Sequence, residues 1–119
     1  MSNNYKVGDK DTRPWGNWEV LSAGDGFCVK KIVVDAGQIL SLQSHNFREE
    51  NWIIASGEAV VTLENKKVKK NVGESVYIPV GVKHRIQNDS DMPLIFIEIQ
   101  TGEKLDENDI IRYEDKYGR

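Results

Sequence analysis

Short runs of apolar residues, alternating with polar ones and separated by turn residues, dominate the chain. Residues 19–22 and 27–35 form the first such runs, and after Ala36-Gly37 they become regular, at 39–45, 52–55, 59–64, 68–72, 75–78, 84–88 and 94–100. Glycine, proline and asparagine between the runs favour turns. Many short strands at this spacing predict an all-β sandwich or barrel. Only residues 107–113 are compatible with a helix.

Candidate chemistry is concentrated in residues 37–57, which read GQILSLQSHNFREENWIIASG. Gln43 and His45 are two positions apart, so on an extended strand both side chains leave the same face. Glu50 follows a polar turn at residues 46–49 and leads into a second strand that can run back beside the first. Neighbouring strands would then bring an amide oxygen, an imidazole and a carboxylate to a common point, as in a partial metal site.

The second of only two histidines, His84, follows a turn marked by Pro79 and Gly81. Gln43, His45, Glu50 and His84 together would offer nitrogen and oxygen ligands without a thiolate, a set that suits Zn, Mn, Fe, Co or Ni. Such a set leaves positions open for a substrate on a six-coordinate ion. The alternatives are that each histidine is an ordinary hydrogen-bonded residue and that Gln43 is a buried amide bonded to backbone.

The two histidine segments match the paired motifs of the cupin superfamily, G-x5-H-x-H-x(3,4)-E-x6-G and G-x5-P-x-G-x2-H-x3-N, at every spacing, with Gln43 replacing the first histidine. Further motifs resemble the type II phosphomannose isomerases, namely RPWG at 13–16, LSLQ at 40–43, residues 50–57, YIPVGVKHR at 77–85, IEIQTG at 97–102 and the terminal YGR. The resemblance implies a cupin double-stranded β-helix, or jelly-roll, barrel over residues 13–119, after a loose N-terminal arm at 1–12. It also implies one divalent metal ion, held by Gln43, His45, Glu50 and His84.

The resemblance implies an activity as well. It suggests a metal-dependent aldose–ketose isomerase that interconverts mannose 6-phosphate and fructose 6-phosphate, with a base moving a proton between C1 and C2. In that family the domain is commonly the C-terminal part of a longer chain that begins with a mannose-1-phosphate guanylyltransferase. We expect no guanylyltransferase activity here, because the chain has no Gly-rich nucleotide-binding segment.

Several charged residues are candidates for binding and catalysis. In the resembling family the arginine at the position of Arg48 is associated with sugar-phosphate binding, and a guanidinium can bond two phosphate oxygens at once; a solvated loop arginine is the alternative. Lys83 and Arg85 flank His84 and should point away from it, although either could reach substrate from its strand. Lys31 and Glu98 are candidate proton carriers if they face the interior, where a charge must be paired or used. An ordinary ion pair between them is equally compatible.

The sequence also departs from the family pattern Q-x-H-H-H-R-x-E-H-W. Asn46, Phe47 and Asn51 each replace a histidine. This departure favours an alternative function, a non-catalytic metal-containing cupin that binds a sugar phosphate or nucleotide sugar. A third class with the same fold is a metal-dependent dioxygenase.

Composition narrows the remaining choices. Sixteen basic and 19 acidic residues are well mixed along the chain, without the basic stripe of a nucleic-acid binder. No apolar run approaches the roughly 20 residues that cross a bilayer, so we expect no membrane span. A single cysteine and the lack of a signal-peptide pattern predict a cytoplasmic protein without disulfides. Tyr5, Val7 and Trp15 have no obvious place in a small barrel, which predicts a homodimer.

Overall fold

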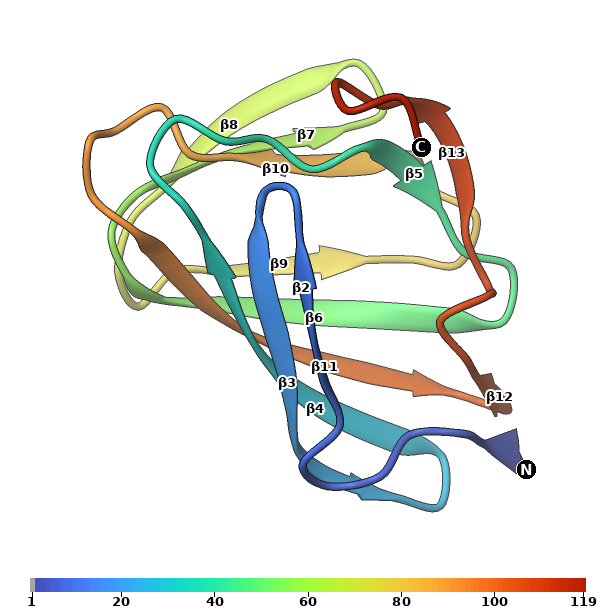
Figure 1. Cartoon of the computed structure of the whole chain (residues 1–119). Helices are drawn as coiled ribbons and strands as arrows, with labels where there is room; N and C mark the ends of the chain where they lie inside the picture. The colour runs from blue at the N-terminus through green and yellow to red at the C-terminus, as the bar shows by residue number, and fades with distance from the viewer. Residues whose placement is uncertain (1) are drawn as a thin grey trace.

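Two antiparallel sheets face each other in the computed structural model, which describes residues 2–119 (Figure 1). One sheet has six strands in the order β2 (Lys10–Arg13), β3 (Gly16–Gly24), β4 (Phe27–Val34), β11 (Leu94–Gly102), β6 (Arg48–Ser56) and β9 (Ser75–Ile78). The other has five, in the order β13 (Ile111–Glu114), β5 (Leu42–Ser44), β10 (His84–Gln87), β7 (Ala59–Leu63) and β8 (Lys66–Lys70). A short parallel pair joins β1 (Ser2–Asn3) to β12 (Lys104–Leu105). The all-β prediction is therefore confirmed.

The inward side chains of the six-stranded sheet lie in rows across its central strands, β4, β11 and β6. One row is apolar, with Ile32, Phe96 and Ile54 directly opposite one another. The next row is Lys30, Glu98 and Trp52, and the one after it is Cys28, Gln100 and Glu50. Residues opposite each other on neighbouring strands share a face of the sheet. One part of the space between the sheets is therefore filled by hydrocarbon, and the adjoining part is lined by polar groups.

The N-terminal segment is packed against the barrel, in contrast to the loose arm expected from its polar sequence. β1 and β2 both pair with other strands, and Tyr5 is buried with its ring edge-on to Trp18, at a centroid distance of 6.3 Å. Trp15 is buried as well, whereas Val7 is exposed. Tyr5 and Trp15 therefore find their partners within the chain, which removes most of the reason for a homodimer, and the oligomeric state stays a prediction. Met1 lies outside the described residues.

The helix with which residues 107–113 were compatible does not form. Ile111–Glu114 is instead β13, which pairs antiparallel with β5 and places Arg112 opposite Gln43. The unpaired edge of β5 supplies backbone hydrogen bonds to this segment, so tertiary pairing overrides a weak local preference. Residues 2–119 contain no helix, and thus none with the length and apolar character that crossing a membrane demands.

The turn between β2 and β3 requires a glycine at position 16. Gly16 has a φ of 151°, and a Cβ atom there would lie 1.9 Å from the carbonyl oxygen of Val33 on the paired strand. Gly16→Ala should lower the free energy of unfolding by about 3 kcal/mol or more, because backbone atoms must move apart. The measurement is urea unfolding followed by tryptophan fluorescence.

Gly73→Ala is the matched control. Gly73 also has a positive φ, 85°, but no atom lies within 4 Å of the added Cβ. This variant should lose only the cost of the backbone conformation, about 1–2 kcal/mol. Equal losses in the two variants would contradict the steric explanation.

Candidate metal centre

Three buried side chains, His45, Glu50 and His84, converge between the two sheets. One ligand atom from each lies within 4.8 Å of the others. Glu50 is on β6 in the six-stranded sheet, His84 begins β10 in the five-stranded sheet, and His45 follows directly after β5. The sequence prediction that the Gln43 and Glu50 strands are neighbours in one sheet is wrong, since β5 and β6 belong to opposite sheets. The three side chains meet because the two sheets face each other.

Both imidazoles present their Nε2 atoms to the carboxylate of Glu50. Nδ1 of His45 lies 2.7 Å from the carbonyl oxygen of Asp109, and Nδ1 of His84 lies 2.9 Å from that of Val82. A neutral imidazole that donates its Nδ1 proton to a carbonyl keeps a lone pair on Nε2. The Nε2 atoms face Glu50, at distances from its carboxylate of 3.2 Å for His45 and 3.8 Å for His84. Such a convergence of acceptors is favourable when a cation lies among them, so the residues fit a metal ion.

Charge states at the cluster suit the same role. Burial lowers the pKa of His45 to about 4, against the attraction of Glu50, so the imidazole is neutral at physiological pH. Burial alone would raise the pKa of Glu50, but the charge of Arg48 holds it below its usual value. Neutral imidazoles and an ionised carboxylate are the forms that ligate metals.

Glu50 is oriented by two donors. Nε of Arg48 donates to its Oε2 at 2.8 Å, and the indole N–H of Trp52 donates to its Oε1 at 3.0 Å. Hydrogen bonds of this kind around a ligating carboxylate fix its direction. The predicted turn at residues 46–49 ends early, because β6 already begins at Arg48. Glu50 is therefore held by a strand instead of a loop.

Gln43, the fourth predicted ligand, lies on the wall of the pocket that contains the cluster. It is directly opposite His84 across β5 and β10, so both side chains share a face of the five-stranded sheet. Its amide Nε2 donates to the carbonyl of Ser41 at 3.4 Å, a contact that also fits the alternative of an amide bonded to backbone. Its role as a ligand stays a prediction.

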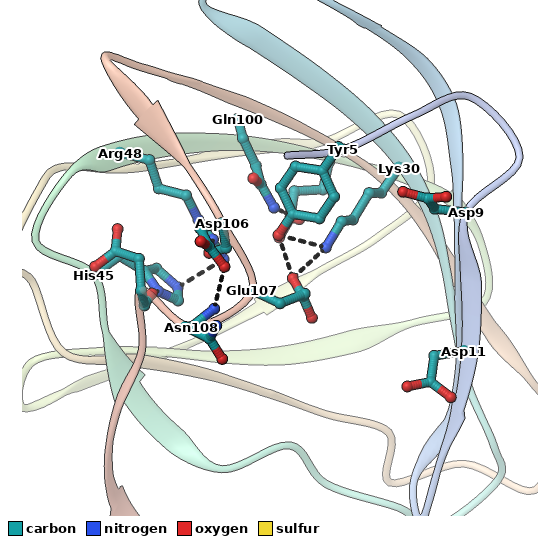
Figure 2. A network of polar contacts seen from close by, with 12 residues as sticks. Tyr5, Asp9, Asp11, Lys30, His45, Arg48, Gln100, Asp106, Glu107 and Asn108 are labelled. Atoms are coloured by element: carbon teal, nitrogen blue, oxygen red, sulfur yellow. Dashed lines mark hydrogen bonds and ion pairs between the residues drawn. The ribbon is translucent and has the colours of Figure 1, made fainter. Parts of the chain in front are cut away.

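Lys31 does not meet the condition for its candidate role, because it is exposed on the outer side of β4 and Lys30 takes the inward position. Nζ of Lys30 lies 2.7 Å from Oε2 of Glu107 and 3.2 Å from the hydroxyl of Tyr5, which also donates to Glu107 (Figure 2). The ammonium group of Lys30 also lies over the Trp18 ring, 4.1 Å from the ring centroid. In the sequence, Lys30 alternates with the apolar Ile32 and Val34, a pattern that indicates that all three face inward from β4.

Glu98 does face the interior, the condition for its candidate role, but its neighbour across β4 and β11 is Lys30, so the possible Lys31–Glu98 pair is not formed. Its carboxyl accepts hydrogen bonds from Trp52 Nε1 at 3.1 Å and Gln100 Nε2 at 2.9 Å. Burial, and then the charge of Glu50, raises the pKa of Glu98 to about 8. The pocket thus holds two carboxyl groups whose pKa values are shifted in opposite directions, downward for Glu50 and upward for Glu98.

Arg48 is buried, which excludes the alternative of a solvated loop residue. Besides its bond to Glu50, its Nη1 donates to the carbonyl of Asp106 at 3.2 Å, and its Nη2 lies 3.4 Å from Nε2 of His45. Figure 2 shows it between His45 and the loop that carries Asp106 and Glu107. The guanidinium therefore joins the cluster to the segment before β13.

Lys83 and Arg85, predicted to contact substrate, lie on the outer face of β10. Lys83 is exposed over the ring of Tyr113, and Arg85 binds the carbonyl of Leu40 at 3.2 Å and the Glu114 carboxylate at 3.1 Å. Alternation along β10 explains this, because His84 between them points inward. Neither residue lines the pocket of the metal cluster.

The pocket contains residues that sequence reasoning missed. Arg13, Arg112 and Arg119 line its wall together with the cluster. Arg13 and Arg119 belong to the RPWG and YGR motifs, which supported the family resemblance without a role for either arginine. Arg112 lies in the one segment that was compatible with a helix, so the sequence predicted no direction for its side chain.

Asp109 was also missed. Its carboxylate accepts the backbone N–H groups of Asn46 at 2.8 Å and Phe47 at 3.0 Å, while its carbonyl binds His45. This residue therefore fixes the loop between β5 and β6. No local sequence signal marks it, because its partners lie more than 60 positions away.

The chain matches the family model described as "Mannose-6-phosphate isomerase C-terminal" over residues 2–115. It is 47% identical over 107 residues to the xanthan biosynthesis protein XanB of Xanthomonas campestris pv. campestris strain B100, covering 90% of this chain and 23% of that protein. It is 39% identical over 115 residues to the mannose-1-phosphate guanylyltransferase of Escherichia coli K12, covering 97% and 24%. The chain thus spans less than a quarter of the length of these relatives.

Solved structures confirm the fold. An uncharacterized protein with a double-stranded β-helix domain from Klebsiella pneumoniae superposes with a TM-score of 0.71 at 19% identity, covering 82% of this chain and 78% of that one. The oxalate decarboxylase OxdC of Bacillus subtilis gives a TM-score of 0.75 at 18% identity, covering 87% and 29%. The predicted jelly-roll barrel is therefore correct. From the family match over nearly its whole length, the chain belongs to the mannose-6-phosphate isomerase C-terminal family of cupins.

Proposed function

We propose that the protein is a metal-dependent aldose–ketose isomerase of sugar phosphates, with mannose 6-phosphate and fructose 6-phosphate as its substrate pair. The observation that carries this proposal is the convergence of the two Nε2 atoms and the Glu50 carboxylate inside a pocket. Family membership supports the choice of reaction. Relatives named for xanthan and alginate biosynthesis support a role in supplying mannose units to polysaccharides.

His45, Glu50 and His84 would hold the metal ion, with Gln43 as the fourth ligand. A divalent ion bound there supplies a Lewis acid that polarises the substrate carbonyl. Nitrogen and oxygen donors of this kind do not select among Zn, Mn, Co, Ni and Fe. Arg48 and Trp52 keep the Glu50 carboxylate aimed at the site through their hydrogen bonds.

Glu98 is the proton carrier that we propose for transfer between C1 and C2. It lines the pocket without belonging to the ligand cluster, and Trp52 and Gln100 fix its two oxygens. General acid–base catalysis needs such a positioned group within reach of the substrate carbon. Lys31 is withdrawn from this role because it faces outward. Lys30 lines the pocket beside Glu98 and would balance its charge when the proton leaves.

The alternative, a binding module without turnover, rested on the histidines replaced by Asn46, Phe47 and Asn51. Asn46 and Phe47 are exposed, and Asn51 lies on β6 between the inward Glu50 and Trp52. None of the three lines the pocket of the metal cluster. The substitutions therefore leave the chemistry of the pocket unchanged, which favours the enzyme over the module.

Removal of either imidazole should remove most of the metal. His84→Ala leaves one nitrogen ligand, and the His45→Ala, His84→Ala double variant leaves none, so we expect a stoichiometric metal in the wild type and almost none in the double variant. Metal content is measured by plasma mass spectrometry after dialysis. Arg85→Ala, which changes the outer face of the same strand, is the control and should keep its metal. Full occupancy in the double variant would refute the ligand assignment.

Catalysis is tested with Glu98→Gln in a coupled assay that converts mannose 6-phosphate. The substitution keeps the size of the side chain but removes the proton carrier, so kcat should fall about 10²- to 10⁴-fold while metal content is retained. Glu49→Gln is the control, because Glu49 bonds to Tyr77 and Thr101 outside the pocket.

The wild-type result decides between the two functions. An active wild type that a chelator inactivates supports the isomerase. Metal-replete protein that binds hexose phosphates but converts none of them would leave the binding module instead.

A further inference from the structure

Three arginines line the solvent side of the pocket whose buried part is the metal cluster. His45, Glu50 and His84 are at most 3% exposed, whereas Arg112 and Arg119 are exposed and Arg13 is half-buried. All of them line the same pocket. The pocket therefore runs from a buried cluster of metal ligands to a rim that carries positive charge.

The rim is built from the edges of both sheets. Arg13 ends β2, the edge strand of the six-stranded sheet, and Arg112 lies on β13, the edge strand of the five-stranded sheet. Arg119 follows β13 at the end of the chain, which Figure 1 shows close to β13 and β5. The arginines are thus brought together by the closure of the barrel.

The charge of Arg112 is the least compensated of the three. Arg13 lies 3.3 Å from Asp11 and 3.7 Å from Glu107, and Arg119 lies 2.9 Å from Asp115. Within residues 2–119, Arg112 has no carboxylate within 4.0 Å and no side-chain hydrogen bond. Partial burial, followed by the charges of Arg119 and Arg13, lowers its pKa against the attraction of Asp115 and Glu107. An anion between these groups would relieve their repulsion.

The two other cations that line the pocket, Arg48 and Lys30, are already engaged. The N–H groups of Arg48 are directed to Glu50, Asp106 and His45, and Lys30 is engaged by Glu107 and Tyr5. Lys83 and Arg85 lie on the outer face. Arg112 therefore remains with its guanidinium free, in a form that can bind two oxygens of a phosphate at once.

Arg112 also stands in line with the metal ligands. It is directly opposite Gln43 on β5, and Gln43 is directly opposite His84 on β10. Residues opposite one another point to the same face, and two strand spacings correspond to about 10 Å between the Cα atoms of Arg112 and His84. A row of this length suits a ligand with its carbonyl at one end and its phosphate at the other.

We propose that Arg112, together with Arg13 and Arg119, forms the binding site for the phosphate group of a sugar phosphate, at the rim of the pocket. The reacting carbonyl end then reaches the cluster of His45, Glu50 and His84. The choice of a sugar phosphate rests on the function proposed above, whereas the binding of a phosphate dianion rests on the arginines themselves.

Inorganic phosphate is the first probe, titrated by calorimetry into protein stripped of metal so that it cannot bind through an ion. Arg112→Gln should raise the dissociation constant for phosphate at least tenfold, because a charge-assisted bidentate contact is lost. Arg85→Gln removes the same group from the outer face of the same sheet and should change the constant less than twofold. Circular dichroism checks that each variant is folded, and Arg112→Lys, which keeps the charge but not the planar fork, should give an intermediate constant.

Metal-loaded protein provides the second readout. Arg112→Gln should raise KM for mannose 6-phosphate about tenfold, with kcat within about threefold of wild type and metal content unchanged. The proposal is overturned if wild-type protein fails to bind phosphate, or if Arg112→Gln binds it as tightly as wild type, even in an active isomerase. If the protein binds phosphate through Arg112 but converts no hexose phosphate, the proposed phosphate site is supported. Only the isomerase function is then refuted.

Discussion

The buried charge of Glu50 is the constraint around which the interior of this barrel is arranged. An ionised carboxylate removed from water is costly unless it is paired and hydrogen-bonded. Here Arg48 and Trp52 bond its oxygens, and His45 and His84 face it with their Nε2 atoms. Arg48 brings a full positive charge to this carboxylate, and its own burial is made tolerable by Glu50. The Arg48–Glu50 ion pair thus helps to hold the metal-ligating side chains in place before any metal ion binds.

The positions of the other polar groups of the interior are set by the rows of side chains that run across the six-stranded sheet. Lys30 and Glu98 share one row, and Gln100 and Glu50 share the next, so each charge has a polar neighbour on an adjacent strand. Lys30 is further stabilised by Glu107 and by the ring of Trp18. The apolar row of Ile32, Phe96 and Ile54 then separates this polar region from the rest of the core.

Both ends of the chain contribute to the pocket. Tyr5, from the segment before β2, joins Lys30 and Glu107, as Figure 2 shows. Asp109, just before β13, holds the loop of His45 through two backbone N–H groups and binds the imidazole itself. The C-terminal segment therefore positions a ligand that belongs to a central motif, whereas the N-terminal segment holds the Lys30–Glu107 pair beside it. A truncated barrel without them would leave His45 without its hydrogen-bond acceptor.

The sequence by itself determined the all-β architecture and the two histidine motifs, because strand alternation and turn residues are local signals. It did not determine which sheet each strand joins, so β5 and β6 were wrongly placed side by side although His45 and Glu50 do meet. A shift of one residue turns a side chain to the opposite face, which is why Lys30 and not Lys31 lies in the pocket. Arg112 and Asp109 acquire their positions only when β13 pairs with the edge of β5, a contact between segments far apart in the chain. Long-range pairing of this kind depends on the whole barrel and leaves no local pattern, so only the tertiary structure decided the rim of the pocket.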